Sequence, residues 1–159
     1  MSSSLRVLLL LFIMAMQPAA YAASAEEIGT VSTEFKLLGA NHKIVMEVFD
    51  DPLVHGVSCY VSRAKTGGVM GSLGLAEDRA EASVSCRQIG DISFDGPIPK
   101  QALAFKQSTS ILFKNIRVIR AVDEKRQTLV YMIYSDKLID GHPQNTITAV
   151  PVGKPIPVK

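Results

Sequence analysis

Short segments in which apolar and polar residues alternate, each ended by turn-forming residues, make up most of this chain. One such segment places Ile44, Met46 and Val48 on one side and Lys43 and Glu47 on the other. A period of two is typical of a strand with one solvated face, here the face with Lys43 and Glu47. The sequence therefore favours strands over helices.

The expected strands cover residues 30–35, 42–49, 57–62, 82–86, 110–122, 128–134 and 146–150. The charged residues 123–127 between two of these strands predict a β-hairpin. We therefore expect a mainly β fold, either a small antiparallel sandwich or a partly closed barrel. One short helix is expected after the glycine-rich loop, because Leu73, Ala76, Ala80 and Ser83 fall at near-helical spacing.

The first 25 residues have the three parts of a secretory signal peptide. Arg6 supplies a basic start, residues 7–16 are an uninterrupted apolar run, and two Ala-x-Ala sites end at Ala22 and Ala25. The apolar run is shorter than the roughly 20 residues that span a bilayer. The sequence predicts export, cleavage after Ala22 or Ala25, a periplasmic location and no stable membrane insertion after cleavage.

The remaining chain has the length of one domain. We expect a single β-domain over residues 26–152 and a flexible tail over residues 153–159, where Pro155 and Pro157 oppose regular structure. The formal net charge of +2 for the full chain is too small to indicate a nucleic-acid binder.

The two cysteines, Cys59 and Cys86, both lie in alternating segments and on the apolar side of each. An even cysteine number in an exported chain indicates one disulfide. Closing this loop contributes roughly 3 to 4 kcal/mol in the chain-entropy model. A redox or metal-binding pair is the alternative, although the spacing matches neither C-x-x-C nor a zinc knuckle.

Residues 66–74 form a glycine-rich loop, the most conspicuous candidate for a binding site. It lacks the G-K-[ST] of a P-loop and the G-x-G-x-x-G of a dinucleotide site, so we expect no cofactor. A flexible loop is one interpretation, and an anion-binding nest is the other. The residues of that nest are Arg63, Lys65, Thr66, Gly67 and Gly68.

No arrangement of residues identifies a catalytic or metal centre. The three histidines have no ligand spacing, and Ser72 does not lie in a G-x-S-x-G elbow. Asp50 and Asp51 are explained by a turn before Pro52, with paired catalytic carboxylates or calcium ligands as the alternatives. The cations Lys114, Arg117 and Arg120 form no single stripe and are expected on a solvated face.

Several segments resemble the CreA family of Gram-negative bacteria. They are Glu26–Gly29, His42–Val45, Phe49–Pro52, Cys59–Gly68, Leu73–Asp78, Tyr134–Lys137 and Ala149–Val152. The resemblance covers nearly the whole chain after the leader, and Cys59–Gly68 is its most specific part. It departs at Gln107–Ser108, where the family pattern has basic residues.

The resemblance implies an exported protein without an assigned activity, whose family name reflects a neighbouring signalling system that responds to carbon source. Two functions are therefore carried forward. The first is a periplasmic, non-enzymatic binding or accessory protein with an envelope ligand or protein partner, linked to envelope or carbon-source signalling. The alternative is a hydrolase-like enzyme whose site combines the Arg63–Gly74 loop with Asp50 and Asp51.

Overall fold

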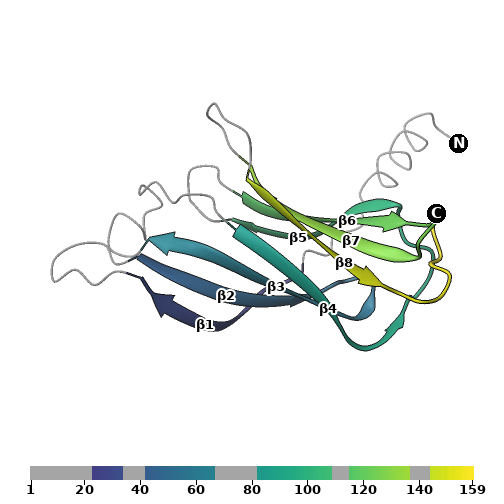
Figure 1. Ribbon diagram of the computed structural model, residues 1–159, viewed down its shortest axis with the longest axis horizontal. Coiled ribbons are helices and arrows are strands. Elements are labelled where there is room, and N and C mark those ends of the chain that lie inside the picture. Colours follow the sequence, from purple (N-terminus) through teal and green to yellow (C-terminus); the bar gives the residue numbers. More distant parts are fainter. Residues whose placement is uncertain (1–22, 34–41, 67–81, 109–114, 137–143) are drawn as a thin grey trace, which may run out of the picture.

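The computed structural model describes residues 23–33, 42–66, 82–108, 115–136 and 144–159. These residues form two four-stranded antiparallel sheets that pack face to face (Figure 1). One sheet contains β1 (Glu26–Ser32), β2 (His42–Asp50), β3 (His55–Thr66) and β4 (Ala82–Ser93). The other contains β5 (Gln101–Ser108), β6 (Asn115–Asp123), β7 (Thr128–Ser135) and β8 (Asn145–Pro151).

In both sheets the strands lie side by side in chain order, so the topology is two consecutive meanders. The prediction of a mainly β antiparallel sandwich is confirmed. The described residues contain no helix. Most of the helix expected from Leu73 onward lies outside them, and Ser83 belongs to β4 instead.

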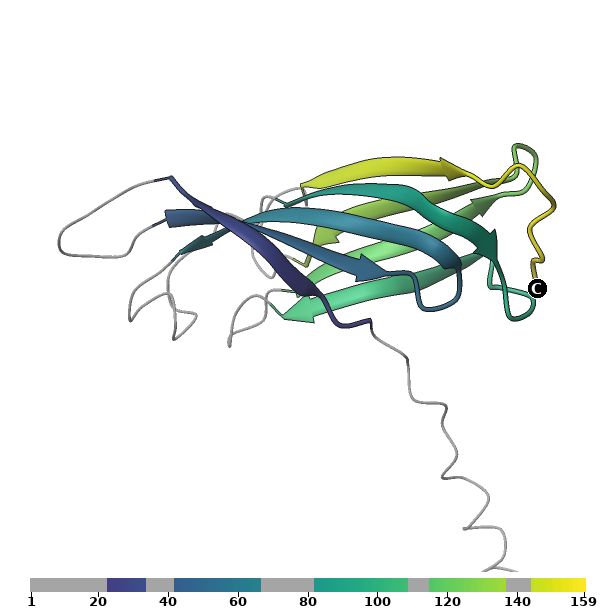
Figure 2. The ribbon, with the colours of Figure 1, turned by 90° about the horizontal axis from the view of Figure 1, so that it is seen from below.

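The two sheets are closely apposed along the edge formed by β4 and β8 (Figure 2). There the Val84 N–H donates to Thr146 Oγ1 at 3.1 Å, which joins the first sheet to the second. The apolar core lies between the sheets, and β1 and β5 are their remaining edge strands.

The face of β2 that packs on the core is the opposite of the expected one. Val45, Glu47 and Phe49 are buried, whereas Ile44 and Met46 are 40% and 39% exposed. Pairing with β3 fixes this choice, because Phe49 and Glu47 lie opposite Cys59 and Val61, which face the core. The expectation failed because a charged residue, Glu47, occupies a core position.

The disulfide joins Cys59 and Cys86, as the sequence predicts. The two residues are direct partners across β3 and β4, and both are buried. The disulfide therefore links neighbouring strands and does not bridge the two sheets.

Strand β5 was not expected, because its apolar residues do not alternate. Ala104 and Phe105 are adjacent in the sequence, and both are buried. A β-bulge between Leu103 and Phe105 shifts the register against β6 and makes this possible. Phe105 then stacks on Phe49 of the first sheet, with ring centroids 4.4 Å apart.

The C-terminal residues 153–159, expected as a flexible tail, lie against the sandwich. Ile156 is buried, and Val158 forms a parallel bridge with Ile98. The Ile98 N–H donates to the Pro157 carbonyl at 2.8 Å, and the Ile156 N–H donates to Gln127 Oε1 at 2.6 Å. The prolines thus shape an extended segment that covers one end of the core.

Removing the disulfide is expected to lower the melting temperature of the folded chain. The double variant Cys59→Ser/Cys86→Ser loses the loop constraint on its unfolded state, roughly 3 to 4 kcal/mol. For a domain of this size the loss corresponds to a shift of roughly 10 °C in a calorimetric or circular-dichroism melt. Reductant should shift the wild type equally and leave the double variant unchanged. A wild-type melt that reductant does not move would contradict the prediction.

Candidate functional site

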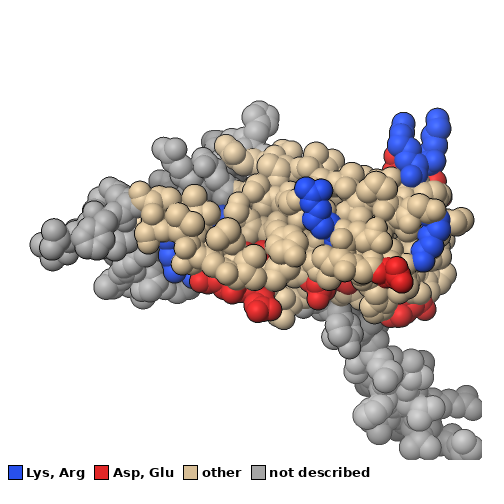
Figure 3. Space-filling view, turned by 60° about the horizontal axis from the view of Figure 1, so that its bottom comes forward, with Lys and Arg blue, Asp and Glu red and all other residues tan. Residues whose placement is uncertain are grey.

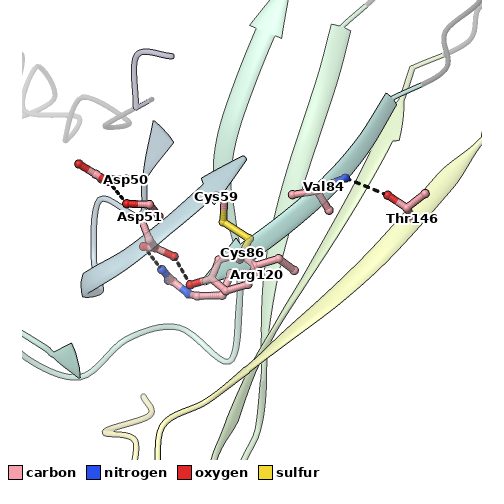
Figure 4. Close-up of a disulfide and its surroundings, with 9 residues drawn as sticks. Asp50, Asp51, Cys59, Val84, Cys86, Arg120 and Thr146 are labelled. Carbon is pink, nitrogen blue, oxygen red and sulfur yellow. Dashed lines mark hydrogen bonds and ion pairs between the residues drawn. A yellow bond between two sulfur atoms is a disulfide. The ribbon is translucent and has the colours of Figure 1, made fainter. Parts of the chain in front are cut away.

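A charged cluster lies in the core between the two sheets. Arg120 of β6 is 1% exposed, and its Nη1 donates to Asp51 Oδ1 at 2.5 Å (Figure 4). Tyr131 of β7 donates its hydroxyl to Asp51 Oδ2 at 2.8 Å, and the Leu53 N–H donates to Asp51 Oδ1. Asp51 is therefore held by three donors from both sheets.

The environment of this cluster keeps Tyr131 protonated. Burial, followed by the negative charge of Asp51, raises the pKa of the Tyr131 hydroxyl far above its usual value of 10.0. Tyr131 is thus a permanent hydrogen-bond donor to Asp51. With its carboxylate engaged by Arg120 and Tyr131, Asp51 serves as a structural counter-ion.

The solvated face expected for Lys114, Arg117 and Arg120 is wrong for Arg120. This residue occupies the inward side of β6, in line with Ile116, Val118 and Val122. Arg117 is half-buried and donates to Asp136 at 2.8 Å, while Lys114 lies outside the described residues. Two nitrogens of Arg120, Nε and Nη2, have no hydrogen-bond partner among the described residues.

A second buried ion pair joins β2 and β3, four residues before Asp51 along the chain. Arg63 donates from Nε and Nη2 to the two carboxylate oxygens of Glu47, both at 2.8 Å. Gln107 of β5 donates to the same carboxylate at 3.2 Å across the sandwich. Hydrogen bonds from Arg63 outweigh burial and hold the pKa of Glu47 below its usual 4.5.

The described part of the expected anion-binding nest is incomplete. Arg63 faces the core, where its charge is matched by Glu47, and Lys65 is exposed. Thr66 is the last residue of β3, and Gly67 and Gly68 lie outside the described residues. The nest therefore remains a prediction, without Arg63 as a free cation.

Only part of the combined site of the enzyme alternative lies among the described residues, namely Asp50, Asp51 and the loop residues up to Thr66. Asp50 lies opposite Ser58 at one end of the β2–β3 pair, and Lys65 lies opposite Lys43 at the other. The seven-residue span from Ser58 to Lys65 is about 24 Å of strand. Asp50 accepts a hydrogen bond from the Ser58 hydroxyl, and Asp51 is buried. Residues 67–74 lie outside the described residues, so the enzyme alternative stays a prediction.

The described residues contain no group of three or more His, Cys, Asp or Glu side chains that could hold a metal ion. His55 pairs with Asp95 at 2.9 Å on the surface, and His142 lies outside the described residues. His42 and His55 are the first residues of β2 and β3, so they lie at opposite ends of this antiparallel strand pair.

The candidate binding site is the outer face of the first sheet, which we call the outer face of β1–β4. Large apolar side chains are exposed on it, namely Ile28, Val31, Ile44, Met46 and Tyr60. In Figure 3 this side of the molecule is a broad, mostly uncharged surface, with acidic side chains gathered along its lower margin. Exposed apolar patches of this kind mark binding surfaces.

Two adjoining hollows lie on the outer face of β1–β4. One, of about 270 Å³, is lined by Ile44, Ala64 and Gln144, and the other, of about 280 Å³, by Ile28, Met46 and Tyr60. Both share Ser62 and Ser83, whose hydroxyls are 2.8 Å apart. Small residues on β3 and β4 therefore form a floor, and large apolar residues of β1–β3 form one wall.

Sequence reasoning missed this site because it assigned Ile44 and Met46 to the core. The signal that would have found it is the pairing of Val45 and Phe49 with the cysteine side of β3. Once Cys59 faces inward, its partner Phe49 must do the same, and Met46 must face outward.

The fold and the site define a small all-β sandwich with one cross-strand disulfide and a hollowed apolar face. Within the described ranges, no helix is long and apolar enough to cross a membrane. A family model described as "CreA protein" matches residues 28–154, and the chain belongs to the CreA family. The resemblance stated from the sequence is confirmed.

Three relatives agree with this assignment. The chain is 53% identical over 134 residues to Protein CreA of Escherichia coli (strain K12), which covers 82% of this chain and 85% of the relative. The Protein CreA of the O6:H1 and O157:H7 strains of Escherichia coli matches to the same extent. No solved structure is significantly similar to this chain.

Asp51→Asn is expected to destabilise the fold severely. The substitution leaves the Arg120 charge buried without its counter-ion, which costs about 3 to 5 kcal/mol. Tyr131→Phe removes one hydrogen bond to Asp51 and should cost about 1 kcal/mol. Urea denaturation measures both. Asp123→Asn, which breaks the exposed pair with Arg126, is the matched control and should change little. Equal effects of Asp51→Asn and Asp123→Asn would show that the buried pair is not required.

The pH dependence of stability should report on Glu47. Because its pKa is lowered in the folded state, its stabilising contribution is complete above the usual value of 4.5. That contribution is lost as the pH falls from 4.5 through the lowered value. In denaturation at a series of pH values, Glu47→Gln should flatten this acid limb, whereas Glu124→Gln on the exposed hairpin should not. An unchanged limb in Glu47→Gln would contradict this assignment.

Proposed function

We propose that this chain is a periplasmic, non-enzymatic binding or accessory protein whose binding site is the outer face of β1–β4. The observation that carries the proposal is the pair of adjoining hollows that share Ser62 and Ser83. Apolar side chains form much of their walls, and their floor carries hydroxyl groups, a combination that is common in binding sites. A periplasmic ligand or partner with an apolar surface fits this description.

The disposition of the charged residues favours binding over catalysis. A general base needs an accessible side chain within reach of a substrate. In the described residues, the buried carboxylates Asp51 and Glu47 are each occupied by an arginine and by a further donor. The hollows on the outer face of β1–β4 are lined mainly by hydroxyl, amide and apolar groups, and Arg63, which also lines one of them, is paired with Glu47.

The leader sequence supports a role after export, and the fold favours one cleavage site. Ala23 and Ala25 pack against the core just before β1. Cleavage after Ala22 keeps both contacts, whereas cleavage after Ala25 removes them. We therefore expect the mature chain to begin at Ala23, in a compartment where the disulfide is stable.

The experiment is unreduced native mass spectrometry of the chain purified from the periplasm. Wild type should begin at Ala23 and retain a ligand or partner. Met46→Lys places a charge in the hollow beside Tyr60 and should lose the bound species. Met132→Lys is the matched control, because Met132 is equally exposed on the other sheet, and it should retain the species.

Three outcomes would contradict the proposal. Equal retention by Met46→Lys and Met132→Lys would place binding elsewhere. Turnover of an envelope substrate by the pure chain would make the protein an enzyme. Recovery of the chain outside the periplasm with residues 1–22 still attached would remove the proposed location.

A further inference from the structure

Strand β1 is the most exposed strand of the described fold. Six of its seven residues are exposed, and Ile28 and Val31 are 53% and 52% exposed. Its one neighbour is β2, and no described strand lies on its other side (Figure 1). An uncovered edge strand with apolar side chains is a template for pairing with another strand.

The backbone groups available on this edge can be assigned. The Thr33 N–H donates to the His42 carbonyl at 2.9 Å, and the register continues through Val31 opposite Ile44 and Gly29 opposite Met46. Because alternate residues of an antiparallel strand bond to the same neighbour, residues 29, 31 and 33 bond to β2. Thr30 and Ser32 therefore direct their N–H and C=O groups away from the sheet.

A β-bulge brings a third residue into this set. The register against β2 shifts between Glu27 and Gly29, so Ile28 is the extra residue. The β2 residues that bond to β1 are His42, Ile44 and Met46, and Glu27 lies opposite Glu47, which is not one of this alternating set. The free edge therefore presents the backbone groups of Glu27, Thr30 and Ser32.

This edge is complementary to itself when a second copy runs antiparallel. With Thr30 opposite Thr30 of the second copy, Val31 lies opposite Gly29, which has no side chain of its own and is covered by the end of the Met46 side chain. The extra residue Ile28 then brings Glu27 opposite Ser32. In the pairs Thr30–Thr30 and Ser32–Glu27, both residues have free backbone groups that can bond across the two-fold axis. In the pair Val31–Gly29, a large side chain lies beside a residue that has none.

The charges favour the same arrangement. Ser32, Lys43 and Lys65 are successive partners across β1, β2 and β3, so two lysines lie directly opposite each other. Like charges in such positions repel, and an acidic neighbour relieves the repulsion. Glu27 of an antiparallel second copy lies in this row, whereas a parallel copy places Glu27 beside Glu27.

We propose that β1 pairs with β1 of a second copy about a two-fold axis at Thr30, which joins two first sheets into one continuous eight-stranded sheet. The inference is independent of the proposed function, since it uses the edge of β1 and not the hollows. A single strand pair buries less than the roughly 1,200 Å² of typical stable interfaces, so the dimer is expected to be weak and concentration-dependent.

The first test is sedimentation velocity of the mature, oxidised chain over a series of concentrations. Wild type should shift from monomer to dimer as the concentration rises. Thr30→Pro removes a free edge N–H without removing a β1–β2 hydrogen bond, and it should remain monomeric. A wild type that stays monomeric at every concentration would overturn the proposal and leave the edge for a different strand.

Charge reversal tests the orientation in a way that does not depend on folding of the proline variant. Glu27→Lys and Lys43→Glu should each weaken association by roughly fivefold, and the double variant should recover it. Glu124→Lys on the distant hairpin is the matched control and should associate like wild type. No recovery in the double variant would overturn the antiparallel register.

Hydrogen exchange distinguishes this dimer from one formed through the sheet face. As the concentration rises, protection should increase at the amides of Thr30 and Ser32 and stay constant at Val31, which already bonds to β2. Dimerisation without added protection at Thr30 and Ser32 would overturn the proposal.

Discussion

The buried ion pair between Asp51 and Arg120 is the interaction on which the position of the two sheets depends. Asp51 follows the last residue of β2, and Arg120 and Tyr131 lie on β6 and β7, so their hydrogen bonds cross the sandwich. Apolar packing alone allows two sheets to slide, because it is not directional. A buried charge with a specified counter-ion allows one alignment, since any shift leaves Arg120 unpaired in the core.

The contact between Glu47 and Gln107 has a related role. It joins β2 to β5, and Arg63 neutralises the charge of Glu47 within the first sheet. Polar contacts thus connect the sheets at separated points, with the Phe49–Phe105 stack and the aliphatic core between them. Together with the Val84–Thr146 hydrogen bond, they fix the relative position of the sheets along the strands and across them.

The fold class, the hairpin and the disulfide could be predicted, because each depends on local alternation or on a cysteine pair. The faces of β2 could not be predicted from the strand alone. Glu47 and Arg120 occupy core positions, and each is tolerated there only because its partner comes from another strand. Strand β5 was missed for a different reason, since its bulge places Ala104 and Phe105 inward together. The candidate binding site was not predicted for the same reason as the faces of β2. Phe49 pairs with Cys59 and faces the core, so Ile44 and Met46 must lie on the surface.

The cross-strand position of the disulfide has a consequence for the covalent integrity of the chain. Cys59 and Cys86 lie on either side of residues 67–81, in strands that pair directly with each other. A protease that cuts the backbone once within that segment would therefore leave both fragments joined through sulfur and still aligned by the β3–β4 ladder. In an oxidising compartment such a nicked chain remains one molecule, whereas in a reducing one only non-covalent contacts would hold its halves together.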